Sequence, residues 1–445
     1  MNMKTVYYTL LFLLIGMQVL SQSFYKGEKK KFKPSLVVTT DFSYEFHSKS
    51  MQKTELILKP EFTYSFNRKI KLVFKGQIYT EFQDKLESGR PKENTVSTAN
   101  KRWFIGERTA VELRELYIYT SVFKKLRLTI GKQQIVWGQT DGLKLLDVVN
   151  PQNFREFMLD DFEDSRIPLW SLKAEFVISD LGVQFIWIPD NTYHITQGFE
   201  APFFTKNLFE KLPYGMQMQL ENPIKPNRFL ADSDIGLKLS TFKKGWDLSF
   251  NYLYYYDDLP VFYSETITVT TRPITKISPI FKRQHLIGGT FNKVFGSTTF
   301  RGELAYVFNQ NFTSNASNSV RGIEQSNVYK SAIGIDYIKG EHVVSFQLFT
   351  DWVVSSIAPY NRDRLETNTS LQISKELLND DLKAEILWVH NANHGDGYVV
   401  SKVSYWLNSN TKLLLSSSIF YGNETQLFGQ FTDRSRMSFG FVWGI

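Results

Sequence analysis

The chain of 445 residues has no cysteine, which excludes disulfide bonds, thiolate metal sites and lipid attachment through an N-terminal cysteine. Beyond its N-terminal segment it has no apolar run of about 18 residues, so no helix of the mature chain is expected to cross a membrane. Its basic residues are scattered among acidic ones, although the formal net charge is +7. A nucleic-acid-binding protein would show a basic patch on a recognisable module, so nucleic acid is excluded as a partner.

Motifs of catalysis and metal binding are also absent. No glycine-rich phosphate loop follows an expected strand, and the Gly-x-Ser-x-Gly pattern does not occur. His194 and His285 lie near the ends of expected strands, but neither has an assignable Ser or Asp partner. His390, His394 and Asp396 have a metal-like spacing without a further convergent ligand, which favours a solvated loop tip. We predict a protein that is not an enzyme and has no cofactor, no metal and no catalytic residue.

The N-terminus indicates export from the cytoplasm. Lys4 precedes an apolar run over residues 6–20, and the small residue Ser21 follows it. The run is short for a spanning helix, which needs about 20 residues, so a signal peptide over 1–21 is favoured over a membrane anchor. Residues 22–35 are then expected to form a periplasmic lead.

What the chain has in abundance is alternation of apolar and polar residues. Aromatic residues make up 15% of the chain, and many of them recur at every second position of short segments. Between residues 70 and 82, for example, Ile70 and Phe74 lie on one face and Lys71 and Lys75 on the other. A soluble β-sandwich alternates in the same way, so a single strand does not distinguish it from a membrane barrel.

The lengths of the connections favour the membrane barrel. The expected strands span 36–46, 54–66, 69–82, 112–121, 125–137, 168–179, 182–189, 231–240, 245–256, 283–294, 297–308, 329–338, 342–352, 365–377, 381–391, 396–407, 411–421 and 434–445. Short connections such as 67–68 and 339–340 alternate strictly with long ones such as 83–111 and 190–230. Short periplasmic turns and long outer loops are typical of transmembrane β-barrels, in which an even strand count puts both termini in the periplasm. We predict an all-β fold, a single antiparallel transmembrane β-barrel over 36–445 with about 18 strands, 16 being the alternative.

The last strand carries a further membrane signature. Met437, Phe439, Phe441, Trp443 and Ile445 fall on one of its faces. It resembles the C-terminal assembly signal of outer-membrane proteins, although its last residue is Ile rather than Phe or Trp. The resemblance implies recognition by the barrel-assembly machinery. The aromatic face is expected to contact outer-membrane lipid and to form girdles at the two interfaces, so we predict localisation in the cell outer membrane.

One connection differs from the others. Residues 138–167 lack strand periodicity, and loops of this length are usually functional or disordered. Their apolar residues, among them Leu143, Leu146 and Phe157, argue against disorder. We therefore expect this connection to fold back against another part of the chain.

The same region resembles a known family. The residues that carry the resemblance are Leu113-Arg114-Glu115-Leu116-Tyr117, Gly131-Lys132-Gln133, Val136-Trp137-Gly138, Asp147 and Asn150-Pro151. Over residues 112–170 they resemble a family of outer-membrane barrels of unknown function, related in architecture to alginate-export and substrate-specific porin barrels. The resemblance implies transport across the envelope and, for some members, an inner-membrane exporter of the resistance-nodulation-division type as a partner. In porin-like barrels a loop in this position can fold into the lumen and narrow it.

We therefore predict constriction residues in and beside the long connection. They are Trp137, Gly138, Asp141, Asp147, Asn150, Pro151, Arg155, Asp160, Asp161, Asp164 and Arg166. The acidic run from Asp160 to Asp164 lacks the spaced Asp/Asn-Gly pattern and the terminal Glu of a calcium loop. Two interpretations of this run stay open: one half of a selective constriction, and a solvated loop held by local ion pairs.

Charged residues on the polar faces of the strands are predicted to line the lumen. They are Lys59, Glu61, Lys71, Lys75, Arg127, Arg301, Glu303, Lys383 and Glu385. Opposite charges two positions apart, such as Arg301 and Glu303, can pair along their strand or with its neighbour. The mixed signs predict a hydrogen-bonded, partly filled interior, because a strongly anion-selective pore would need an unbalanced basic ring.

Together these patterns predict an outer-membrane channel or facilitator for a small or amphiphilic solute. Two other classes stay open: a barrel-embedded lipid-modifying hydrolase, and a barrel whose long loops only bind partners at the cell surface. Neither the solute nor its direction of travel follows from the sequence.

Overall fold

The computed structural model describes most of the chain. The described residues are 31–123, 125–198, 201–205, 217–269, 272–314, 319–355 and 362–445. The predicted signal peptide 1–21 lies outside these residues, as does most of the lead 22–35. Within the described part, no helix is long and apolar enough to span a membrane.

Long strands dominate the described residues. The barrel strands are β1 (Phe32–Glu45), β2 (Ser50–Ser65), β3 (Ile70–Glu81), β5 (Thr109–Phe123), β6 (Leu126–Gln133), β7 (Leu169–Ile178), β8 (Leu181–Ile188), β10 (Asp234–Lys243), β11 (Trp246–Tyr256), β14 (Arg283–Phe295), β15 (Thr298–Thr313), β16 (Ile323–Lys339), β17 (His342–Val353), β18 (Leu365–Leu377), β19 (Leu382–Asn391), β20 (Gly397–Asn408), β21 (Thr411–Tyr421) and β22 (Arg436–Gly444). The other elements are β4 (Trp103–Ile105), β9 (Gln217–Leu220), β12 (Val261–Val269), β13 (Arg272–Ile280), the short helix α2 (Phe162–Ser165) and the 3-10 helix η2 (Gly429–Arg434).

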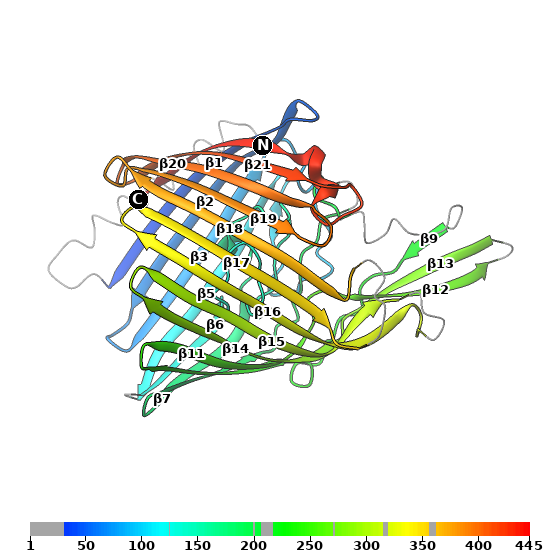
Figure 1. The fold of residues 1–445 in the computed structure, drawn as a ribbon, viewed down its shortest axis with the longest axis horizontal. Coiled ribbons are helices and arrows are strands. Elements are labelled where there is room, and N and C mark those ends of the chain that lie inside the picture. Colours follow the sequence, from blue (N-terminus) through cyan, green and yellow to red (C-terminus); the bar gives the residue numbers. More distant parts are fainter. Residues whose placement is uncertain are drawn as a thin grey trace.

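The barrel strands form one closed antiparallel sheet (Figure 1). Each pairs with its neighbours in the chain, and β1 pairs both with β2 and with the C-terminal strand β22, which closes the ring. Closure leaves no unpaired strand edge, as a membrane interior requires. The predicted barrel of about 18 strands is therefore confirmed, every predicted span overlaps one of its strands, and the alternative of 16 is wrong.

Several predicted boundaries are wrong: β16, for instance, begins at Ile323 rather than at residue 329, and β15 ends at Thr313 rather than at residue 308. Strand β1 begins at Phe32 rather than at residue 36, because residues 32–35 pair with the end of β2 and the Phe32 ring packs on Phe62. Strand β6 ends at Gln133 rather than at residue 137, so the long connection comprises residues 134–168. Its first residues leave the ladder because their side chains bind inside the barrel.

The predicted strict alternation of short and long connections is also wrong. The turns at one end of the barrel are all short, and the C-terminus lies at that end (Figure 1), where Leu36 and Ile445 exchange backbone hydrogen bonds. At the other end most connections are long, but those over 46–49 and 392–396 are tight. The small sheet of β9, β12 and β13, which the sequence did not predict, projects beyond this end.

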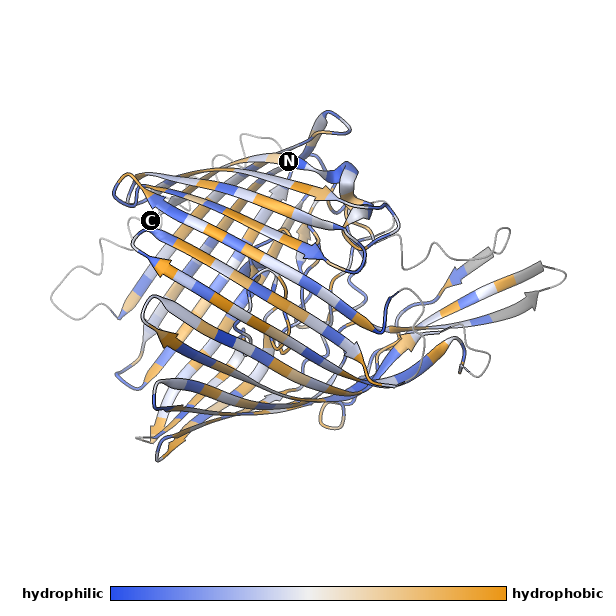
Figure 2. Ribbon diagram, viewed as in Figure 1, coloured by the Kyte–Doolittle hydropathy of each residue, from blue (hydrophilic) through white to orange (hydrophobic). Residues whose placement is uncertain are grey.

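The outer face of the barrel is apolar, and hydrophobic residues alternate with hydrophilic ones along the strands (Figure 2). Phe62 and Phe74 stack there with ring centroids 5.0 Å apart. Ile386 and Phe439 each expose 47% of their surface. Large apolar side chains exposed around a closed barrel suit contact with lipid chains.

The interior also contains apolar packing, which alternation alone did not predict. Inward-facing residues such as Leu253, Leu286 and Val307 form a buried cluster with Leu145 and Leu146 of the long connection. A second cluster surrounds Phe157 and includes residues of β19 to β21 and η2. Its members are Leu86, Phe157, Phe203, Val389, Tyr398, Phe420, Phe428 and Phe431. Leu143 packs against both clusters, so apolar contacts extend from one wall of the barrel to the other.

Candidate functional site: the segment across the lumen

Residues 134–168, called the lumen segment from here on, enter the barrel directly after β6. Trp137 is almost fully buried, and its Nε1 donates a hydrogen bond to Gln184 Oε1 of β8 at 2.7 Å. The indole lies against Gly236 of β10, where an added Cβ would be 2.6 Å from Trp137 Cη2. Gly138 packs just as closely, because a Cβ there would be 2.8 Å from the backbone N of Asp147. The small residues let the chain fold close to the wall.

Side chains of the family motif tie the two ends of the lumen segment together. Asn150 Oδ1 accepts a hydrogen bond from Ile135 N at 2.6 Å, and its Nδ2 donates to Ile167 O at 2.9 Å. Ile167 N donates to Pro151 O at 2.8 Å. These contacts make the start and end of the segment one compact base.

Charged residues of the motif complete this base. Arg166 Nη2 lies 2.8 Å from Asp147 Oδ2, and both side chains are largely buried. Arg114 Nη2 of β5 donates to Arg166 O at 2.7 Å. Lys132 Nζ of β6 donates to Leu113 O at 2.6 Å. The buried cations thus bind carbonyl and carboxylate oxygens, as buried charges require.

The wall formed by β15, β16 and β17 holds the next part of the segment. Arg301 of β15 pairs with Asp141 of the segment, and its Nε lies 2.8 Å from Asp336 Oδ2 of β16. Glu303 accepts hydrogen bonds from two backbone N–H groups of the segment, Gln139 and Leu146, the latter at 2.9 Å. Arg301 and Glu303 therefore bind the segment rather than each other.

The wall formed by β22, β1 and β2 holds the middle of the segment. Arg155 Nη2 lies 2.6 Å from Glu55 Oε1, and Glu156 pairs with Lys53 Nζ at 2.7 Å and with Arg436. Burial alone would raise the pKa of Glu156, but the charges of Lys53 and Arg436 outweigh it and hold that pKa below its usual range. Of this cluster the sequence predicted Arg155 alone, although Arg436 lies on the polar face of the last strand.

The acidic run reaches a third part of the wall. Asp164 Oδ1 lies 2.6 Å from Lys59 Nζ of β2, and Asp161 Oδ2 lies 3.5 Å from Lys402 Nζ of β20. Asp161 is 76% exposed and Lys402 is 32% exposed. Glu163, two residues after Asp161, is 75% exposed and faces Lys75 of β3. Water therefore reaches the space between α2 and these strands, in contrast to the buried contacts of Glu156 with Lys53 and Arg436.

Asp160 differs from its acidic neighbours. Burial, and next to it the negative charge of Glu156, raise the pKa of Asp160 to about 7. This carboxyl group therefore changes its charge in the neutral range, whereas Asp161 and Asp164 face basic partners.

The other charged residues that were predicted to line the lumen do not bind the lumen segment. They are exposed or pair with other residues of the barrel strands. Lys383 Nζ lies 2.7 Å from Glu385 Oε1 on the same strand. Glu61 stands opposite Lys75 in the β2–β3 ladder. Lys71 and Arg127 are exposed.

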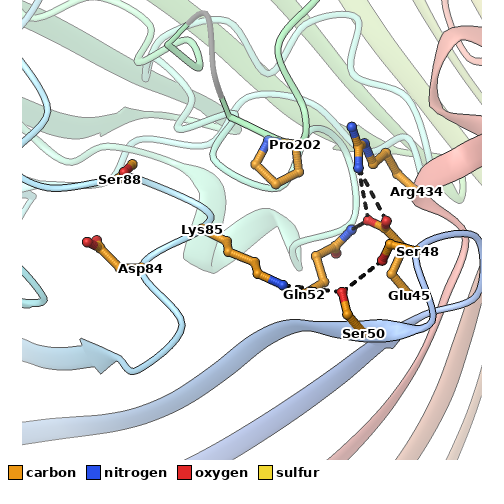
Figure 3. Close-up of a pocket in the computed structure, with 9 residues that line it drawn as sticks. All are labelled: Glu45, Ser48, Ser50, Gln52, Asp84, Lys85, Ser88, Pro202 and Arg434. Carbon is orange, nitrogen blue, oxygen red and sulfur yellow. Dashed lines mark hydrogen bonds and ion pairs between the residues drawn. The ribbon is translucent and has the colours of Figure 1, made fainter.

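Cavities lie on both sides of the lumen segment. One of about 630 Å³ is bordered by residues 91–95, 195–198 and 220–223 and reaches Arg155. Another, of about 350 Å³, is lined by Arg127, Lys238 and Asp247 and reaches Gln139. A third lies at the rim beside β1, and Figure 3 shows that two of its charged residues are bound within it, Arg434 to Glu45 and Lys85 to Ser50. The lumen segment thus contributes Arg155 to the first of these cavities and Gln139 to the second.

The histidines weighed from the sequence do not converge. His194 Nδ1 accepts a hydrogen bond from Gln152 N at 2.8 Å, and burial, with the charge of Lys144, lowers its pKa to about 3. His285 Nδ1 lies 2.9 Å from the hydroxyl of Tyr252.

The three residues with a metal-like spacing in the sequence, His390, His394 and Asp396, do not converge either. His390 stacks on Trp388 with ring centroids 5.3 Å apart. Asp396 accepts a hydrogen bond from the backbone N of Phe428 at 2.7 Å. His394 lies elsewhere, beside Glu366. His390 lies on a face of β19, His394 lies in a rim connection, and Asp396 binds the backbone inside the barrel. Their closeness in the sequence therefore does not bring the three side chains together.

A closed barrel with a held segment in its lumen is the architecture of outer-membrane porins. The chain belongs to the family described as "Protein of unknown function (DUF1302)", whose model matches residues 106–441. This confirms the resemblance drawn from the motif. No curated protein matches the chain.

Several solved porin structures are similar to this chain. Pseudomonas aeruginosa OccK5 (OpdH) matches with a TM-score of 0.51 and 11% identity, over 94% of this chain and 98% of that one. Acinetobacter baumannii OccAB3 matches with a TM-score of 0.52 and 9% identity, over 94% and 100%. Pseudomonas aeruginosa OpdK with vanillate matches with a TM-score of 0.51 and 10% identity, over 94% and 100%. At such identities the likeness concerns the fold.

Proposed function

We propose that this chain is an outer-membrane channel or facilitator for a small or amphiphilic solute. The observation that carries the proposal is the position of the lumen segment, which binds inward-facing side chains on β2, β15 and β20. A segment held on several sides of a barrel sets the width of any passage through it. The fold of substrate-specific porins supports this function, and two of those structures are described as complexes with vanillate and with glucuronate.

We place the passage on the wet side of the segment, between α2 and strands β2, β3 and β20. The side chains there are charged and partly exposed, with acids on the segment and lysines on the wall. On the other side, Leu146 and its neighbours pack without exposed surface. Because acids on one side of the passage face lysines on the other, the passage could bind a solute that carries a polar or charged group. The apolar interior nearby could bind the apolar part of an amphiphilic solute.

The test is to delete residues 142–164 and record single-channel conductance in planar bilayers. The barrel should still fold, because its ladder hydrogen bonds are made by the strands. Conductance should rise severalfold, because the segment no longer occupies the lumen. The matched control shortens the β12–β13 hairpin, which projects beyond the rim and should leave conductance unchanged. Unchanged conductance in a folded deletion would place the passage elsewhere and contradict the proposal.

Charge selectivity gives a second readout of the same site. Neutralising Asp161, Glu163 and Asp164 together should shift ion selectivity toward anions, because Lys59, Lys75 and Lys402 then face the passage without acidic partners. A variant that neutralises Glu324 on β16, away from this wall, should leave selectivity as it is.

Localisation and partners form part of the proposal. The exposed residues Met437 and Phe439 on the outer face of β22 support recognition of this strand by the barrel-assembly machinery. An inner-membrane exporter is proposed as a partner on the family resemblance, and cross-linking in intact cells tests it. Incubating membranes with labelled phospholipid tests the alternative that the barrel is a hydrolase. We expect no phospholipid turnover that depends on this chain; such turnover would favour the hydrolase over the channel.

A further inference from the structure

Three side chains of metal-ligand type converge at the rim, away from the lumen segment. Asp363 precedes β18, Glu366 is the second residue of β18, and His394 lies in the tight connection 392–396. One donor atom of each lies within 4.8 Å of the donor atoms of the other two. His394 Nε2 is 3.4 Å from Glu366 Oε1. One ion could therefore contact all three residues after small side-chain movements.

The arginines beside this cluster do not neutralise it. Arg362 Nη2 binds Asp351 Oδ1 at 2.9 Å, and Arg364 Nη2 donates to Val354 O at 3.4 Å. Among the contacts of the described residues, His394 is the one basic side chain that pairs with Glu366. The two carboxylates repel each other at this short range. A cation bound between them and the imidazole would relieve this repulsion.

Neighbouring amides orient the two carboxylates. Asn393 Nδ2 donates to Asp363 Oδ2 at 2.8 Å, and Asn391 Nδ2 donates to Glu366 Oε2 at 3.1 Å. Carboxylate oxygens have more than one acceptor position, so these bonds leave capacity for a metal. Hydrogen bonds of this kind fix the orientation of ligands in metal sites.

We propose that Asp363, Glu366 and His394 bind a divalent transition metal of the Zn²⁺ type, which ties the start of β18 to connection 392–396 at the rim of the barrel. Imidazole nitrogen and carboxylate oxygen are ordinary zinc ligands, and three protein ligands with water in a fourth position form an open site. The histidine disfavours Ca²⁺ and Mg²⁺, which prefer oxygen ligands. The site does not depend on the proposed channel function.

The test is a calorimetric titration of the folded full-length chain in detergent with Zn²⁺, after removal of any polyhistidine tag. We expect one site per chain and a loss of affinity of at least about tenfold in His394→Ala and in Glu366→Gln, since each variant loses one of three ligands. Excess Ca²⁺ should not displace Zn²⁺.

The matched control is His47→Ala. His47 Nδ1 lies 3.1 Å from Asp433 Oδ1 at the same rim, in a pair with one carboxylate. This variant should bind Zn²⁺ as the parent does. Three results would overturn the proposal: no Zn²⁺ binding by the folded parent, unchanged affinity in folded His394→Ala, or an equal loss in His47→Ala. Migration of unheated protein in gels verifies that each variant is folded.

Discussion

At the scale of single residues, adjacent positions of one strand face different surroundings. Phe74 stacks on Phe62 at the outer face of β3, whereas Lys75 Nζ lies 3.3 Å from Glu115 Oε2 inside the barrel. Because successive side chains of a strand point to opposite faces, a shift of one residue would put Lys75 in lipid and Phe74 in the lumen. The register of every strand is therefore strongly determined.

The first prediction concerns this residue alternation. Phe74→Arg or Ile386→Arg should each cost about 2–4 kcal/mol of folding free energy, because a charge enters the lipid-facing surface. Lys71→Gln is the matched control, since Lys71 is already exposed on β3 and its neutralisation should cost much less. Urea unfolding in liposomes measures the three variants. Equal losses at both kinds of position would mean that the faces are misassigned.

At the scale of elements, the lumen segment is held mostly by ion pairs rather than by a ladder. Glu156, for example, lies between Lys53 of β2 and Arg436 of β22, and all three side chains are buried. Removing one partner of a buried pair typically costs about 3–5 kcal/mol, because the other charge is left without compensation. The stability of the folded segment should therefore depend on pH.

The second prediction concerns the pH dependence of this element. The pKa of Asp160 is raised from its ordinary value of 3.8 to about 7, so the folded segment favours the protonated acid. Its stabilising contribution is complete below about pH 4 and is lost as the pH rises to about 7. Hydrogen exchange of residues 139–166, corrected for intrinsic rates, should be faster at pH 8 than at pH 5. Asp160→Asn should reduce this difference, and an identical pH dependence in the variant would show that another group is responsible.

At the scale of the whole molecule, the barrel has two unlike ends. One end has short turns and the C-terminus, and the other has the long connections, the small sheet and the proposed metal site (Figure 1). In membrane barrels the end with short turns faces the periplasm. The orientation of the chain then follows from the connection lengths alone.

The third prediction tests this orientation. Epitope tags inserted at Gly89 and Gly395 should be accessible to antibody on intact cells, whereas tags at Gly296 and Gly340 should become accessible after the envelope is opened. All four glycines have open space around the Cα, so an insertion at any of them should leave the barrel folded. Labelling of Gly340 alone on intact cells would reverse the orientation.

How much could be predicted depends on the range of the interaction. Alternation and turn residues act between neighbours in the chain, and they located every barrel strand and the lipid-facing side of β3 and β19. The boundaries at Phe32 and Gln133 were missed, because pairing with a distant strand extends β1 and contacts inside the barrel end β6. The short strand β4 and the strands β9, β12 and β13 were missed, because they arise within connections.

The sequence by itself determined that this chain is a closed membrane barrel with a motif-bearing segment after its fifth predicted strand, because period-two alternation and connection length are local properties. The tertiary structure decided what that segment binds. Asp164 meets Lys59 and Glu156 meets Arg436 only because the closed ring brings β2 and β22 around the same lumen. The pairing of β18 with β19 places His394 beside Glu366, since ion pairs and metal ligands depend on distances in space that sequence spacing does not specify.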